Sequence, residues 1–265
     1  MKTVFSNVMA IYRRELQSYF SSPFAYIIAG VFWLLSGLFF IAMLLGPNGL
    51  IANVAYLDGK GITEPVDVPY EFLKVYLGVL GSISLFILPM LSMGLYAEER
   101  KRGTLELLAT SPITNWAVAL GKLLGVVTFF LTLILPLLVY EAIALSASDP
   151  PIQPTVFLLG HIGLILLAAT VLSLGMFISS LTDSTILAGF LTFTISVFLW
   201  VIDLVATGIG GALGDALGHL SLEKNYTNLV QGILDPSSIV VFITYIVLGL
   251  FLTAQAIEAF RFQRS

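Results

Sequence analysis

Six long apolar stretches limit what this chain can fold into. They lie at about residues 24–45, 75–97, 113–140, 156–180, 185–206 and 238–259. A helix needs about 20 apolar residues to cross a hydrocarbon core of roughly 30 Å. Unpaired backbone groups cannot face lipid, and the stretches lack the alternation of a barrel strand. The sequence therefore predicts an all-α integral membrane protein with six transmembrane helices, and a mean hydropathy of +0.99 agrees.

Short polar motifs predict where several of these helices begin. Ser22-Pro23, Ser111-Pro112 and Asp235-Pro236 each place a capping side chain before a proline at the first helical position, and Asp183 or Ser184 can cap the fifth span. Inside the second and third spans, Pro89 and Pro136 each remove a backbone hydrogen bond. We expect kinks there and regard both prolines as candidate hinges.

The distribution of Lys and Arg predicts the orientation. Nine of the 12 lie on the side of the N-terminus and the other three, Lys60, Lys74 and Lys224, lie on the opposite side. Cytoplasmic loops carry the excess of positive charge. Both termini are therefore expected in the cytoplasm.

Three segments outside the spans have distinct patterns. Residues 1–22 alternate apolar and polar positions at helical spacing, which predicts an interfacial amphipathic helix with Arg13 and Arg14 toward lipid phosphates; a helix packed on a protein partner is the alternative. The acidic loop 46–74 is expected to be solvated, with a cation site as the alternative. Residues 206–237 predict a short helical insertion at the outer surface, where glycines allow close helix contacts.

The spans carry no Asp, Glu, Lys or Arg near their middles. Lys122 lies near an inner end and Glu141 near an outer end, while His161 is expected to face a neighbouring helix. Ion-coupled transporters usually carry buried ionisable relays, so this absence argues against a gradient-driven transporter. The chain also lacks cysteine, clustered histidines and any nucleophile–base or phosphate-loop motif. We therefore expect no catalytic residue, no metal site and no cofactor for this chain, and its formal net charge of −4 gives no support for a nucleic-acid partner.

The most unusual segment is 98–112, between the second and third spans. It opens with five consecutive charged residues, Glu98, Glu99, Arg100, Lys101 and Arg102, in a chain with only 11% charged residues. Gly103 can then turn the backbone, and Thr104 can cap a short helix with Glu106 in its first turn and Leu105 and Leu108 on one face. Such a helix would lie across the cytoplasmic end of a helical hairpin. Docking to a cytoplasmic partner explains this pattern better than a solvated loop with topology-setting positive charges, which stays the alternative.

The same segment resembles a known family. EERKRGTLELLATSPIT followed by GKLLG is similar to the motif of permease subunits of type-2 ABC transporters. The residues that carry the likeness are Glu98, Glu99, Arg100, Arg102, Gly103, Thr104, Glu106, Leu107, Ser111, Pro112, Gly121 and Lys122. Residues 172–190 and 225–265 are further similar to the branch with gliding-motility-type permeases.

This resemblance implies a function. Residues 1–265 would form a single permease domain, without an ATP site, in which 98–112 is the coupling helix that rests on a cytoplasmic ATP-binding subunit. That subunit would hold ATP and Mg, and a second permease copy, identical or related, would complete a dimeric exporter in a bacterial inner membrane. Two rival functions remain: a gradient-driven secondary transporter, and a membrane anchor that recruits an ATPase without transport.

Overall fold

A computed structural model describes residues 2–61, 67–105, 113–146, 148 and 151–262 of the chain. The described part is helical and contains no β-strand. Its helices are α1 (Lys2–Phe20), α2 (Pro23–Leu45), α3 (Leu50–Gly59), α4 (Val68–Ser92), α5 (Gly94–Lys101), α7 (Asn115–Ser146), α8 (Pro154–Leu181), α9 (Thr185–Ile209), α10 (Gly211–His219), α11 (Leu222–Val230) and α12 (Pro236–Phe262).

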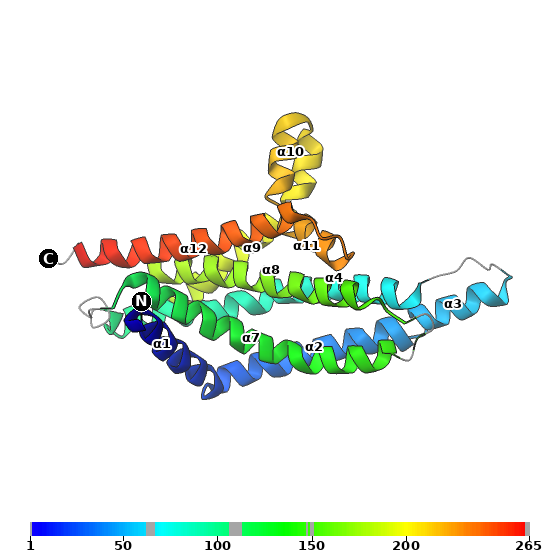
Figure 1. Cartoon of the computed structure of the whole chain (residues 1–265), viewed down its shortest axis with the longest axis horizontal. Helices are drawn as coiled ribbons and strands as arrows, with labels where there is room; N and C mark the ends of the chain where they lie inside the picture. Colours follow the sequence, from blue (N-terminus) through cyan, green and yellow to red (C-terminus); the bar gives the residue numbers. More distant parts are fainter. Residues whose placement is uncertain (1, 62–66, 106–112, 147, 149–150, 263–265) are drawn as a thin grey trace.

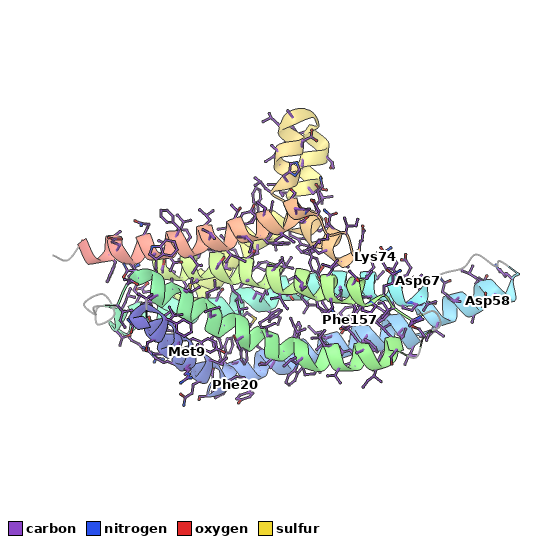
Figure 2. The ribbon with its side chains drawn as sticks, viewed as in Figure 1. Met9, Phe20, Asp58, Asp67, Lys74 and Phe157 are labelled. Atoms are coloured by element: carbon purple, nitrogen blue, oxygen red, sulfur yellow. The ribbon has the colours of Figure 1, made fainter. Side chains whose placement is uncertain are left out.

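The long helices run side by side and form an elongated bundle with two distinct ends (Figure 1). One end carries α1, α5 and the last turn of α12, and we call it the N-terminal end. The other, the far end, carries α3, and Figure 2 places Asp58, Asp67 and Lys74 toward it. Within the described residues, six segments are long and apolar enough to cross a membrane, which confirms the predicted all-α membrane fold.

Helix α8 forms the centre of the bundle. It packs against α4, α5, α7, α9, α11 and α12. The most apolar part of α8 is 72% buried and that of the α4–α5 segment is 67% buried, whereas those of α2 and α9 are each only 22% buried. The core therefore surrounds α8 and α4, and α2 and α9 form the periphery.

Most predicted helix starts agree with the structure. Ser22 caps α2 by accepting a hydrogen bond from the Ala25 amide, and Ser184 caps α9 in the same way at Leu187. Asp235 accepts from the Ser237 amide at the start of α12. The predicted Ser111-Pro112 cap lies outside the described residues.

The prediction of a solvated loop over 46–74 is wrong in two parts. Residues Leu50–Gly59 form helix α3, and α4 begins at Val68 rather than near residue 75. The side chain of Asp67 accepts a hydrogen bond from the Tyr70 amide, so α4 has a capped start that precedes its apolar run. Because the first turns of α4 contain polar residues, hydropathy alone did not predict where this helix begins.

The insertion between the fifth and sixth spans consists of two short helices. α10 stands away from the bundle beside the end of α9 (Figure 1). Gly210 and Gly211, with φ of 66° and 64°, make the turn, and a Cβ on Gly214 would lie 2.6 Å from the Ala206 carbonyl oxygen. The predicted close glycine contact is therefore present. α11 packs its buried residues Tyr226, Leu229 and Val230 onto the bundle.

Candidate functional site

The charged run Glu98–Arg102 continues the helical hairpin at the N-terminal end of the bundle. α4 ends at Ser92, and α5 follows after Met93 and carries the first four of the five charged residues. Gly103, with φ of 69°, ends the helix as predicted, and the Thr104 amide and hydroxyl both donate to the Glu99 carbonyl. The charged run is thus helical rather than a loose turn.

The charged side chains divide between two directions. Glu98, Lys101 and Arg102 are exposed, and Glu98 pairs with Arg102 one turn later at 3.3 Å. Glu99 and Arg100 turn toward the bundle instead. The exposed pair of Glu98 and Arg102 contributes less than about 1 kcal/mol to stability. The exposed side chains are therefore available for a partner, while the inward ones hold the helix in place.

Glu99 meets a buried lysine from α7. The Lys122 ammonium contacts three oxygens: Glu15 Oε1 of α1 at 2.7 Å, the Leu95 carbonyl at 2.9 Å and Glu99 Oε1 at 3.0 Å. Only 3% of the Lys122 side chain is exposed. Arg14 adds an outer contact to Glu99 at 3.4 Å. We call these four residues, Glu15, Arg14, Glu99 and Lys122, the Lys122 cluster.

The Lys122 cluster has balanced charge. Two carboxylates face one buried ammonium and one guanidinium, so no charge remains uncompensated within the cluster. A buried cation needs such pairing because desolvation otherwise costs several kcal/mol. The cluster therefore joins three helices, α1, α5 and α7, through a single lysine.

Arg100 and the start of α5 are tied to α8. The Arg100 guanidinium donates to the Ser180 carbonyl at 3.0 Å and lies 5.1 Å from the centre of the Phe260 ring of α12. Ser179 Oγ accepts from the amides of Tyr96 and Ala97, at 3.0 and 2.9 Å. These are amides that the first turn of a helix leaves without intrahelical partners. α8 thus supplies the cap that lets α5 begin after the break at Met93.

The N-terminal helix contacts the hairpin closely. A Cβ on Gly121 would lie 2.8 Å from Ile11 Cβ, and one on Gly125 would lie 2.7 Å from Glu15 Cβ, so α1 and α7 meet at glycines. Tyr19 of α1 donates to the Leu91 carbonyl of α4 at 2.6 Å. Burial, and then the nearby charges of Glu15 and Glu98, raise the pKa of Tyr19, so its hydroxyl keeps the donated proton.

The predicted site residues have different places. Arg13 and Arg14 are both exposed, and Arg14 also reaches Glu99, a contact that the membrane-facing prediction did not include. Leu105 is buried rather than part of an exposed apolar face. The predicted short helix itself, with Glu106 and Leu108, lies outside the described residues.

The two predicted hinges lie inside helices. Pro89 is within α4, four residues before the break at Met93, and Pro136 is within α7. Their role as hinges stays a prediction.

Reasoning from sequence missed Glu15 and Ser179. Glu15 lies among the polar residues of an amphipathic helix, and its partner Lys122 is 107 positions away. Only the charge balance gave a signal, because a lysine at the end of an apolar span needs a carboxylate. Ser179 gave none, since serine is common in membrane helices.

The described residues contain no group of three or more His, Cys, Asp or Glu side chains that could hold a metal ion. The site consists of a short charged helix with ionic contacts to α1 and α7 and hydrogen bonds to α8. This arrangement suits the transmission of force from a docked partner.

Comparison with known proteins gives one family. The family model described as ABC-2 family transporter protein matches residues 67–211, which contain α4, α5, α7, α8 and α9. No curated protein matches the chain.

Proposed function

The chain belongs to the ABC-2 family of transporter proteins, and from this membership we propose that it forms the translocation pathway of a dimeric, ATP-driven exporter. The family consists of membrane transport subunits. In the proposal, a separate cytoplasmic subunit binds and hydrolyses ATP. A second permease copy, identical or related, completes the pathway in a bacterial inner membrane with both termini in the cytoplasm.

The division of the charged run carries this proposal. Glu98 and Lys101 of α5 and Arg102 directly after it are exposed, while Glu99 and Arg100 attach the same helix to the bundle. A helix whose charges served only solubility would not need one of its carboxylates, that of Glu99, to be paired with a buried lysine. The exposed charges are the docking surface in this proposal, and 98–112 is the coupling segment.

The inward contacts give a route for force. A push on α5 would reach α7 through Lys122, α1 through Glu15 and α8 through the contacts of Ser179 and Ser180. A set of ionic contacts in a site of low dielectric resists shear better than a flexible loop. ATP-driven closure of the partner subunits would then move these helices together and open the pathway at the dimer interface.

A mild-detergent purification of the tagged chain from its native membranes tests the composition of the complex. Mass spectrometry should identify a near-stoichiometric subunit with a phosphate-binding loop. Any second membrane chain would decide between a homodimer and a heterodimer. Recovery of the chain alone, with a control complex shown to survive the same detergent, would contradict the proposal and favour a gradient-driven transporter.

An exchange of two charges tests the docking surface. The double variant Glu98→Arg/Arg102→Glu keeps the two charges four positions apart, at α5 and its C-cap, but reverses the charge pattern that a partner meets. We expect insertion into the membrane to be unchanged and ATP hydrolysis to be uncoupled from transport. The matched control is the exchange Glu71→Lys/Lys74→Glu on α4 near the far end, which should leave coupling intact.

A further inference from the structure

A second buried ionic contact lies near the far end of the bundle, away from the Lys122 cluster. Glu141 of α7 is fully buried, and the His161 side chain of α8 is only 5% exposed. The His161 Nε2 and Glu141 Oε2 atoms are 3.1 Å apart. Among the described residues, neither the two carboxylate oxygens nor His161 Nε2 has a hydrogen-bond partner. Ionisation of a carboxyl group in such a place has a large desolvation cost unless a partner compensates the charge.

The other ring nitrogen fixes the protonation of the histidine. His161 Nδ1 lies 2.8 Å from the Phe157 carbonyl oxygen, which can only accept a hydrogen bond. Nδ1 therefore carries a proton. Nε2 then faces the carboxylate either with its own proton, as imidazolium, or as an acceptor of a proton from the carboxyl group. In both cases the pair holds one proton, either on Nε2 or on the carboxyl group 3.1 Å away.

The neighbouring titratable groups do not compensate the charge of Glu141 in place of this proton. Tyr140 of α7 and Tyr76 of α4 share a hydrogen bond through their hydroxyls, and Tyr76 also contacts the Ser36 carbonyl. The hydroxyl of Tyr226 of α11 donates to the Leu77 carbonyl. These tyrosines are neutral donors that already have partners. His161 is therefore the group that compensates Glu141.

We propose that Glu141 and His161 form a proton-binding site, and that the bound proton fastens the far end of α7 to α8. When the proton leaves, a buried carboxylate faces the lone pair of a neutral imidazole, and the contact becomes repulsive. The far ends of the two helices then separate. This site is additional to the proposed transport function and does not depend on an ATPase partner.

The position of the pair gives it a mechanical consequence. Glu141 is 19 positions after Lys122 on α7, a rise of about 28 Å along a helix. At the N-terminal end, α7 is held by Lys122 and α8 by Ser179 and Ser180. Loss of the proton therefore releases the far end only, while the contacts at α5 persist.

Because the natural chain has no cysteine, a distance measurement can test this proposal directly. The variant Ser146→Cys/Thr155→Cys carries one nitroxide label on the exposed end of α7 and one on the exposed start of α8. Pulsed electron paramagnetic resonance in lipid nanodiscs then reports their separation from about pH 5 to about pH 9, a range that includes the ordinary titration of histidine. We expect a single short distance in acid and a shift to a longer distance in alkali.

Two further variants distinguish the pair from other groups. In Glu141→Gln, the amide can donate to Nε2 without titrating, so the short distance should persist at every pH. In His219→Gln, the other histidine is removed, and the pH response should remain.

The ¹⁵N signal of the remaining histidine in His219→Gln should change over the same pH interval as the distance. A distance or a ¹⁵N signal that does not vary with pH would overturn the proposal. So would a response that persists in Glu141→Gln.

Discussion

At the scale of single residues, Lys122 is the side chain on which most of the N-terminal end depends. It is 2% exposed as a whole residue and binds one carboxylate of α1 and one carboxylate and one carbonyl oxygen of α5. The contribution of such a contact is asymmetric. A complete buried pair adds little to stability compared with apolar residues, but removal of one partner leaves a buried charge without compensation.

Replacement of Lys122 should therefore be strongly destabilising. We expect Lys122→Met to lower the free energy of unfolding by about 3 kcal/mol or more, because Glu15 and Glu99 lose their shared cation. Chemical unfolding in detergent measures this loss. The exposed Lys101→Met is the matched control, and its effect should stay within about 0.5 kcal/mol.

The triple variant Lys122→Met/Glu15→Gln/Glu99→Gln separates charge from packing. It removes the two carboxylates together with the lysine, so no uncompensated charge remains in the cluster. We expect it to recover a large part of the stability lost in Lys122→Met. Equal instability of the single and triple variants would show that packing, rather than charge, explains the effect.

At the scale of elements, α1 is attached to α7 by close packing as well as by Lys122. Gly121 and Gly125 lie where α1 crosses, and both lack room for a methyl group. Gly37 of α2, by contrast, has no other atom within 4 Å of a Cβ position. Replacement by alanine is therefore expected to have different effects on stability at these two kinds of glycine.

Gly121→Ala should weaken the attachment of α1. The added methyl group would lie 3.0 Å from the Val8 carbonyl oxygen and closer still to Ile11, so α1 must move away, at about 1–3 kcal/mol. Gly37→Ala should be neutral or slightly stabilising. Thermal unfolding of both variants in one detergent is the measurement. A Gly121→Ala chain as stable as Gly37→Ala would contradict this view of the contact.

The proline positions make a second prediction at this scale. Pro89→Ala and Pro136→Ala restore a backbone donor within α4 and α7 and should stiffen these helices. If the prolines are hinges, transport by the assembled complex should fall relative to wild type at equal expression. Pro151→Ala, in an exposed connection, is the control. Unchanged transport by both variants would exclude a hinge role.

At the scale of the whole molecule, the two ends of the bundle have different charge. Three lysines lie outside the predicted cytoplasmic side: Lys60 at the end of α3, Lys74 in α4 and Lys224 in α11. The charged run on α5 lies at the N-terminal end with α1. This is the asymmetry from which the sequence predicts the orientation, and the orientation stays a prediction.

Single cysteines in the natural cysteine-free chain test that orientation. A membrane-impermeant maleimide should label Asp58→Cys on α3 in intact cells and should label Lys101→Cys on α5 only after the membrane is opened. Both positions are exposed, so access to the side chain itself is equal. The opposite labelling pattern would show that the orientation is inverted and that the proposed docking surface lies outside the cell.

Much of this protein follows from its sequence alone. Hydropathy determined the number and class of the membrane helices, because a bilayer admits only segments that satisfy their own backbone. Capping residues determined several helix starts, and the run from Glu98 to Arg102 marked the candidate site. These features are local, and local chemistry is sufficient to predict them.

Only the tertiary structure decided which polar side chains meet. Glu15 pairs with Lys122, 107 positions away, and Glu141 contacts His161 on the next helix. It also decided that Glu99 turns inward while Glu98 stays exposed. The physical reason is that a charge near a membrane helix must be paired, but its sequence does not say with which residue. The partner depends on how the helices pack, and their packing depends on glycines such as Gly121 that allow two backbones to approach.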